Sequence, residues 1–345
     1  MRAVVLVGHG GPEKLEYRED VPDPEAAAGE VLIRVGAAAL NNTDIWTREG
    51  AYGAERDQGV PRGWRREPLS FPRIQGADIA GRIEAVGSGI SQERVGERVL
   101  VDNALYSGDG EGLLDAGIVG SERDGGFAEL VAVPAENAHR IVSDLSDAEL
   151  ASFPTAYVTA ERMLNRARLG AGETVLVTGA SGGVGTGLVQ LAKIRGATAV
   201  AVVGRGKEGL VSEIGAAAVV LRDGDIAPAV ETVLAGAPLD VVADVVGGEQ
   251  VRTLLELLRP GGRYVVAGAI AGPLVTIDLR TIYLKQLEVL GSTMGNRDEF
   301  AALVRHIESG RLKPLVSATY PLAELGRAQA DFEQKTFFGK LVVIP

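Results

Sequence analysis

The chain of 345 residues contains no cysteine, only three histidines and no long apolar run. Without cysteine there can be no disulfide, cysteine nucleophile, thiolate-bound zinc or cysteine-held iron–sulfur cluster. The histidines are far apart and show no metal-ligand spacing. No stretch of about 18 apolar residues predicts a membrane span, and the apolar N-terminal run is too short for a signal peptide. We therefore expect a cytoplasmic protein with no membrane partner.

Positive charge is also scarce. The 35 lysines and arginines are outnumbered by 46 aspartates and glutamates, which gives a formal net charge of -11. Such a chain lacks the basic surface of a nucleic-acid-binding protein. We expect a small-molecule substrate as its partner, and the length allows one large or two ordinary domains.

The first part of the chain has the pattern of a β-rich unit. Short apolar strands alternate with glycine- and proline-rich turns, and this close spacing favours a barrel-like arrangement. The strands are predicted at Ala3–Val7, Glu30–Val35, Ile79–Val86, Arg98–Val101 and Phe127–Val133. Two inserts, Gly53–Ser70 and Asp102–Arg123, interrupt them.

From Asp147 onward strands and helices alternate. One helix is predicted over Asp147–Leu169, and fully apolar strands follow, which is typical of a parallel sheet covered on both faces. These strands are Thr174–Thr178, Ala199–Val203, Ala218–Leu221, Val241–Val245, Tyr264–Ala267 and Leu287–Leu290. The fold class predicted is α/β, with a doubly wound parallel sheet beside the β-rich unit.

A glycine-rich turn joins the first of these strands to a helix. Glycines let the backbone approach a pyrophosphate, and the helix N-terminus offers free N–H groups to it. The predicted dinucleotide contacts are Ser181, Gly182, Gly183 and Val184. A tight structural turn is the alternative.

The end of the next strand bears on the choice between NAD and NADP. An acid there would bind the ribose 2′-hydroxyl and repel a 2′-phosphate. Here the strand is followed by Gly204, Arg205 and Lys207, without an acid. Arginine and lysine both bind phosphate. The sequence therefore favours NADP(H), although the two cations could simply form a solvated helix start.

Five segments together resemble the medium-chain dehydrogenase/reductase superfamily, above all its zinc-independent quinone oxidoreductases and enoyl reductases. They are Gly76–Gly81, Asp124–Glu129, Thr178–Gly185, Arg259–Arg263 and Gly339–Val343. The resemblance covers nearly the whole chain. It implies a GroES-like substrate domain over residues 1–146 and 296–345, and a Rossmann cofactor domain over residues 147–295.

The chain departs from the zinc-dependent members of this superfamily. Those enzymes hold catalytic zinc with cysteine, histidine and a third cysteine or acid, but the matching positions here are Asn41, Ala77 and Thr155, with Asp78 beside them. The segment matching the structural-zinc lobe, Asp102–Arg123, has no cysteine. The resemblance therefore implies a site without metal.

The segment Asn41–Tyr52 is similar to the active-site segment of quinone oxidoreductases. The resemblance implies Tyr52 as proton donor or oxyanion contact, and Asn41 as hydrogen-bond partner of the substrate carbonyl or the nicotinamide ribose. Implied pocket residues are Trp46, Asp44 and Met294. Further implied cofactor contacts are Thr159, Gly268, Ala269, Ile270 and Lys340. Ordinary packing or turn formation is the alternative for each.

Without zinc, alcohol oxidation loses its Lewis acid, whereas a conjugated carbonyl needs only hydride, hydrogen-bond donors and a proton. We therefore expect an NADPH-dependent reductase of quinones or α,β-unsaturated carbonyls. A zinc-free alcohol dehydrogenase or carbonyl reductase, and a non-catalytic NADPH-binding protein, are the alternatives. The resemblance also implies a homodimer, joined through Leu287–Leu290.

Overall fold

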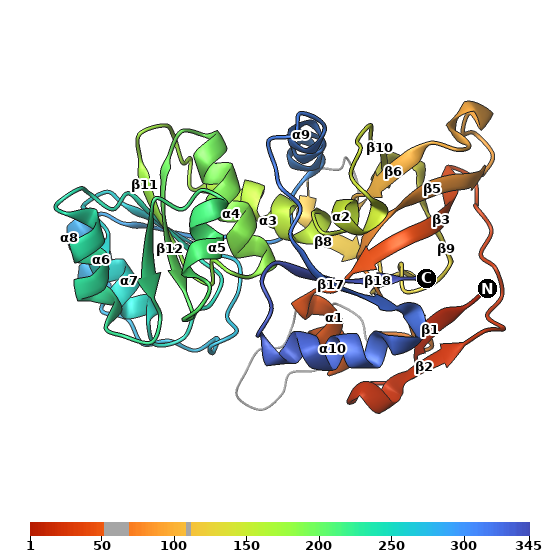
Figure 1. Ribbon diagram of the computed structural model, residues 1–345, viewed down its shortest axis with the longest axis horizontal. Coiled ribbons are helices and arrows are strands. Elements are labelled where there is room, and N and C mark those ends of the chain that lie inside the picture. The colour runs from red at the N-terminus through yellow and green to blue at the C-terminus, as the bar shows by residue number, and fades with distance from the viewer. Residues whose placement is uncertain (52–68, 108–111) are drawn as a thin grey trace. The chain divides into compact units, whose positions relative to one another are not determined.

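The computed structural model describes residues 1–51, 69–107 and 112–345. They divide into two compact units (Figure 1): the β unit, Met1–Thr155 with Pro314–Pro345, and the α/β unit, Ala156–Lys313. The motifs predict the boundaries somewhat earlier, after residues 146 and 295. Helix α2 (Asp147–Ala151) packs on strands of the β unit, whereas α9 (Arg297–Glu308) is tied into the α/β unit by an ion pair.

The main sheet of the β unit is built around β3. Its strands are β3 (Glu30–Ala39), β5 (Asp78–Val86), β6 (Arg98–Val101), β9 (Leu130–Pro134), β10 (Ala138–Arg140), β17 (Val316–Pro321) and β18 (Lys340–Ile344). Within the described residues their order is β10–β6–β5–β3–β18–β17, with β9 also paired to β3. Apolar residues that alternate along β3, such as Val31 and Ile33, face the core. The C-terminal strand is therefore part of the N-terminal unit.

Smaller elements complete the β unit. Strands β1 (Ala3–Leu6), β2 (Leu15–Arg18) and β4 (Arg73–Ile74) form a separate sheet, and β7 (Ala104–Ser107) and β8 (Gly112–Ile118) form a hairpin within the second insert. Helices α1 (Asn42–Arg48) and α10 (Leu325–Gln334) also belong to this unit. Residues 52–68 of the first insert lie outside the described residues.

The α/β unit confirms the doubly wound sheet. Its strands are β11 (Thr174–Val177), β12 (Thr198–Val203), β13 (Ala218–Leu221), β14 (Val241–Asp244), β15 (Arg263–Val266) and β16 (Glu288–Gly291). They are parallel throughout, in the order β13–β12–β11–β14–β15–β16. The direction of winding reverses between β11 and β14, and ligands of such sheets bind at that point, beyond the carboxyl ends of the strands.

Helices cover both faces of this sheet (Figure 1). They are α3 (Pro154–Arg166), α4 (Gly183–Ile194), α5 (Glu208–Glu213), α6 (Ile226–Leu234), α7 (Val251–Leu257) and α8 (Leu279–Lys285). The single helix expected over Asp147–Leu169 is in fact α2 followed by α3. Pro154 explains the break, because proline lacks an N–H, disfavours the helical conformation before it and suits a first helical position.

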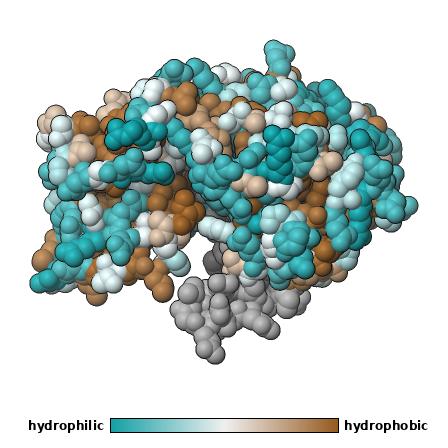
Figure 2. Space-filling view, turned by 60° about the horizontal axis from the view of Figure 1, so that its bottom comes forward, coloured by the Kyte–Doolittle hydropathy of each residue, from teal (hydrophilic) through white to brown (hydrophobic). Residues whose placement is uncertain are grey.

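The surface carries no continuous apolar band on the face that Figure 2 shows, where hydrophilic residues predominate and apolar ones are scattered among them. In the described part of the chain, no helix is both long and apolar enough to cross a bilayer.

Candidate functional site

The turn after β11 is shaped by two of its glycines. Gly179 has a φ of 58°, a left-handed conformation that costs glycine little. A Cβ on Gly185 would lie 2.2 Å from the carbonyl oxygen of Gly179. Helix α4 therefore packs against the turn more closely than any side chain at position 185 would allow.

The N-terminus of α4 is open to a ligand. Its N-cap, Gly182, offers no side chain, and Thr186 is the residue whose N–H bonds back to the Gly182 carbonyl. The amides of the first turn have no partner within the helix, and Ser181–Val184 are partly exposed. These amides, with the positive end of the helix dipole, fit the pyrophosphate of a dinucleotide.

Asp244, at the end of β14, organises the same edge of the sheet. Its buried carboxylate accepts hydrogen bonds from Thr178 Oγ1 at 2.5 Å and Tyr264 Oη at 2.6 Å, and from the backbone N–H groups of Val246 and Gly247. It thereby links the end of β14 to the residue after β11 and to Tyr264 within β15. Sequence analysis did not select Asp244, although an acid in a buried apolar run is itself a signal.

Three cations gather beyond β12. Arg205 is exposed and Lys207 half-buried, as the NADP(H) prediction requires of reachable groups. Arg222, which follows β13, joins them: a Cβ on Gly204 would lie 3.4 Å from its guanidinium carbon. The pKa of Lys207 is lowered by burial and by the nearby charge of Arg222. Sequence reasoning missed Arg222 because it belongs to a different strand end.

The other predicted cofactor positions are spread over the α/β unit. Gly268, Ala269 and Ile270 follow β15, and a Cβ on Gly268 would meet the carbonyl of Val245 at 2.7 Å. The loops after β14 and β15 are therefore in contact. Thr159 is buried in α3. Whether these residues contact a cofactor stays a prediction.

A buried polar cluster lies in the β unit. Lys340, only 3% exposed, donates from Nζ to Asn41 Oδ1 at 2.6 Å and to Asp78 Oδ2 at 2.9 Å. Asp78 Oδ1 also accepts from the backbone N–H of Thr155 at 2.8 Å and from its hydroxyl at 2.5 Å. Asn103 donates to the Thr155 hydroxyl oxygen. The amine of Lys340, which sequence analysis assigned to the cofactor, is thus engaged inside the β unit.

Strand register brings this cluster together. Ala39 of β3 lies opposite Asp78 on one side and opposite Val342 on the other. Continued by two residues, the antiparallel pairing sets Asn41 opposite Lys340. Residues that alternate along a strand share a face, so all three polar side chains lie on the same face.

Asp44 closes the N-terminus of α1 beside the cluster. Its Oδ2 accepts from the backbone N–H of Asn41 at 2.7 Å in a capping box. Burial raises the pKa of the Asp44 carboxyl to about 7, and the nearby negative charge of Asp78 adds to the rise. Arg48, next along α1, instead contacts Gln329 and Glu333 of α10.

One donor in the cluster has no partner among the described residues. Within residues 1–51, 69–107 and 112–345, the buried Nδ2 atom of Asn41 makes no hydrogen bond, a state that costs about 1–3 kcal/mol. A ligand oxygen would relieve that cost. This is the observation that most directly indicates a binding role for Asn41.

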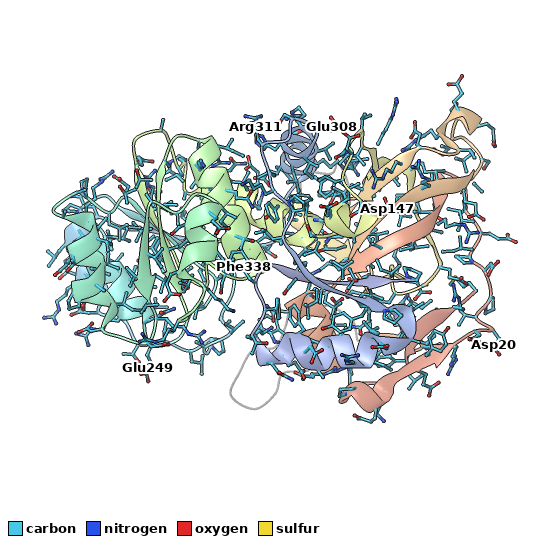
Figure 3. All side chains as sticks on the ribbon, viewed as in Figure 1. Asp20, Asp147, Glu249, Glu308, Arg311 and Phe338 are labelled. Carbon is cyan, nitrogen blue, oxygen red and sulfur yellow. The ribbon has the colours of Figure 1, made fainter. Side chains whose placement is uncertain are left out.

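The remaining predicted pocket residues are less informative. Trp46 is half-buried in α1. Met294 is buried after β16 with a φ of 48°, a left-handed conformation that is strained for a side chain. Tyr52 lies outside the described residues. Apart from these predicted residues, Phe338, labelled in Figure 3, is half-buried just before β18.

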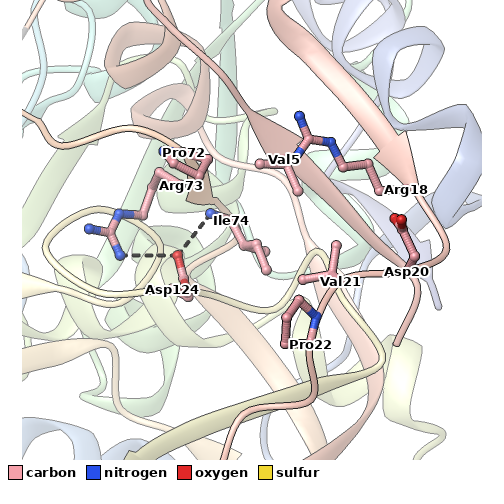
Figure 4. Close-up of a pocket in the computed structure, with 9 residues that line it drawn as sticks. All are labelled: Val5, Arg18, Asp20, Val21, Pro22, Pro72, Arg73, Ile74 and Asp124. Carbon is pink, nitrogen blue, oxygen red and sulfur yellow. Dashed lines mark hydrogen bonds and ion pairs between the residues drawn. The ribbon is translucent and has the colours of Figure 1, made fainter.

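A hollow of about 280 Å³ opens on the β unit, apart from the polar cluster (Figure 4). Arg73 in its wall pairs with Asp124 at 3.0 Å, and Arg18 pairs with Glu16. None of the site residues predicted from the sequence lines this hollow, so it is a weaker candidate for the reaction site than the polar cluster.

Comparison with known proteins places the chain in a family. Residues 27–143 match the alcohol dehydrogenase GroES-like domain, and residues 183–309 match the zinc-binding dehydrogenase family. The chain is 31% identical to the NAD-dependent alcohol dehydrogenase of Sulfurisphaera tokodaii, with 100% of both chains covered. The chain belongs to the medium-chain dehydrogenase/reductase superfamily.

Other members of the superfamily are similarly related. Quinone oxidoreductase of Mus musculus is 31% identical, over 96% of this chain and 93% of that protein. A crystal structure from Sinorhizobium meliloti 1021, provisionally described as an alcohol dehydrogenase, is 59% identical with a TM-score of 0.96, covering 100% of this chain and 96% of that one. This medium-chain dehydrogenase/reductase is therefore an oxidoreductase that uses a nicotinamide cofactor.

The catalytic zinc of the zinc-dependent relatives does not fit the polar cluster of this dehydrogenase/reductase. The matching positions are Asn41, Ala77 and Thr155, whereas zinc takes thiolate, imidazole or carboxylate ligands. The Lys340 ammonium bonds both Asn41 and Asp78, and a second cation there would be repelled. Across residues 1–51, 69–107 and 112–345, no three His, Cys, Asp or Glu side chains are grouped to hold a metal ion.

The raised pKa of Asp44 predicts a pH dependence of stability. Between about pH 4 and 7 the folded protein retains a proton that the unfolded chain releases, so the contribution of Asp44 falls as pH rises. Asp44→Asn should remove this dependence. From about pH 5 to about pH 8, the variant should gain on the order of 2 kcal/mol in unfolding free energy relative to wild type.

Urea unfolding across this pH range measures the effect. Asp278→Asn is the control, because Arg280 lowers the pKa of the exposed Asp278 carboxyl to about 2. Above about pH 5 Asp278 is ionised in both the folded and the unfolded protein, so the unfolding free energy of this control should follow the wild-type pH profile. An Asp44→Asn profile parallel to wild type would refute the burial effect.

Proposed function

We propose that this protein is a zinc-free, NADPH-dependent reductase of quinones or α,β-unsaturated carbonyls. The observation that carries the proposal is the buried Nδ2 of Asn41, which has no hydrogen-bond partner in the described part of the chain. It lies in a cluster whose chemistry does not suit a metal ion. A preorganised N–H donor suits an oxygen that gains negative charge during the reaction. The resemblance to quinone oxidoreductases supports the same reading.

The chain's own residues would act on the substrate oxygen. When bound, the cofactor supplies a hydride to the β-carbon of an enone or to a quinone. The electron pair of the conjugated system moves onto the carbonyl oxygen, and the Asn41 amide donates a hydrogen bond to it. A proton then completes the saturated carbonyl or the hydroquinone. Tyr52 remains the predicted proton donor.

NADPH is the proposed cofactor because of the three cations beyond β12. A ribose 2′-phosphate carries negative charge, and the four residues directly after β12, Gly204–Lys207, include no carboxylate to repel it. Arg205 and Lys207 were expected from sequence, and Arg222 adds a third positive group close to Gly204. The NAD-dependent relative makes NADH the alternative.

A second candidate function is alcohol oxidation or reduction of simple ketones, which the relationship to an alcohol dehydrogenase favours. The rate of NADPH consumption with a conjugated acceptor, compared with that for a saturated ketone, separates the two candidate functions. The purified protein should consume NADPH with a quinone or a conjugated enone at least about tenfold faster, in kcat/KM, than with the matched saturated ketone. A preference for the ketone would refute the proposal, and NADPH binding without turnover would indicate a non-catalytic protein.

The cation cluster predicts selective loss of NADPH affinity. Arg205→Ala, Lys207→Ala and Arg222→Ala should each raise the Kd for NADPH by about tenfold, since each removes a charge-assisted phosphate contact. The Kd for NADH should change by less than about twofold, measured by fluorescence titration. Arg252→Ala, which removes an exposed α7 arginine paired with Glu256, is the control. Equal losses for both nucleotides would reject the 2′-phosphate assignment.

We also propose that the protein forms a homodimer through the edge of the α/β sheet. β16 pairs with β15 on one side and is the edge strand of the described sheet. The backbone N–H and C=O groups on its outer side can therefore pair with another strand. Large apolar side chains are exposed in the same region: Leu274, Leu279, Tyr283, Leu284 and Val289. A second copy of this chain would cover them.

Substitution at this edge tests the dimer. Leu284→Asp with Val289→Asp should convert the wild-type dimer to monomer in light scattering, because burying unpaired carboxylates is costly. Leu210→Asp, at an exposed apolar position of α5, should leave the dimer intact. A wild-type protein of monomer mass would contradict this arrangement.

A further inference from the structure

Lys340, the buried lysine of the polar cluster, contacts the same carboxamide whose Nδ2 has no partner among the described residues. Lys340 Nζ and Asn41 Oδ1 are 2.6 Å apart, and both residues are more than nine-tenths buried. A lysine ammonium can only donate hydrogen bonds, so its partner on the asparagine must be the carboxamide oxygen. This contact settles the orientation of the amide and directs Nδ2 away from Lys340.

The same contact changes the strength of the donor. A hydrogen bond from a cation to an amide oxygen draws electron density from the amide nitrogen, which makes its N–H groups better donors. Such cooperativity is larger where water is excluded, as it is around Asn41 and Lys340. Stabilisation grows as charge develops on the accepting oxygen, so it favours the transition state over the ground state.

The geometry points to Lys340 as a positioning residue that supplies the fixed positive charge of the reaction site, through the Asn41 carboxamide, in place of a metal ion. This inference rests on the proposed function. In this arrangement Lys340 Nζ donates a hydrogen bond to Asn41 Oδ1, and Asn41 Nδ2 donates one to the substrate oxygen. Asp78 holds the other side of the ammonium at 2.9 Å.

A double-mutant cycle tests the coupling between the two residues. Removing Lys340 alone would leave Asp78 as an uncompensated buried charge. The cycle is therefore built on Asp78→Asn, in which loss of Lys340 leaves no unpaired carboxylate and an oxygen is kept for the Thr155 contacts. On it, Lys340→Met should lower kcat with an enone by roughly 10- to 100-fold, with little change in the NADPH Kd.

Adding Asn41→Ala decides whether Lys340 acts through the amide. Asn41→Ala alone should lower kcat by roughly 100-fold, and Lys340→Met should then cost less than about twofold further, because no amide remains to be polarised. Lys335→Met is the matched control. Lys335 also bonds an asparagine of α1, Asn42, but from an exposed position, so kcat should change less than about twofold.

The outcomes separate the two proposals. The inference about Lys340 would be overturned if Lys340→Met and Asn41→Ala lowered kcat independently of each other. It would also be overturned if Asp78→Asn with Lys340→Met kept the wild-type kcat. Neither outcome would affect the reductase assignment. A wild-type protein that reduces no conjugated acceptor would overturn both. Thermal unfolding and the NADPH Kd of every variant show whether the fold is retained, and Lys340→Arg, which keeps the charge, should recover part of the lost kcat.

Discussion

Pairing of the last strand with the third one is the constraint on which the β unit depends. β18 lies beside β3, and their register places Lys340 level with Asn41 and near Asp78. A shift of one residue would turn Lys340 to the opposite face and leave the Asp78 carboxylate buried without its cation. The hydrophobic pattern of β18, with Leu341 and Val343 in the core cluster, keeps that register.

The α/β unit is subject to a different constraint. Backbone N–H groups must be available to a ligand while the carboxyl ends of the strands stay ordered. The glycines after β11 expose amides at the start of α4 because they carry no capping side chain. Asp244 meanwhile satisfies Thr178, Tyr264 and the turn after β14. Buried polar groups that are fully paired stiffen their surroundings, so the open amides lie on a rigid support.

Positive charge is placed in two different ways in this chain, which is acidic overall. One ammonium is buried in the β unit, where Asp78 balances it, and three cations remain reachable beyond β12 of the α/β unit. The first arrangement suits an oxygen that becomes charged during a reaction, and the second suits a phosphate that is charged throughout. Different physical demands thus account for a buried lysine in one place and exposed arginines in the other.

Local pattern was enough to predict the parallel sheet, the glycine turn and the cations Arg205 and Lys207, because these features depend on neighbouring residues. The absence of zinc ligands at Asn41, Ala77 and Thr155 was predicted from the resemblance to the superfamily, which identified the matching positions.

Only the tertiary structure showed that Lys340 contacts Asn41, 299 positions earlier in the chain, that Arg222 joins the cations, and that Asp244 bonds both Thr178 and Tyr264. Such contacts are decided by strand register and sheet order. A single sequence does not encode either in any local signal, because many registers satisfy the same alternation of apolar residues.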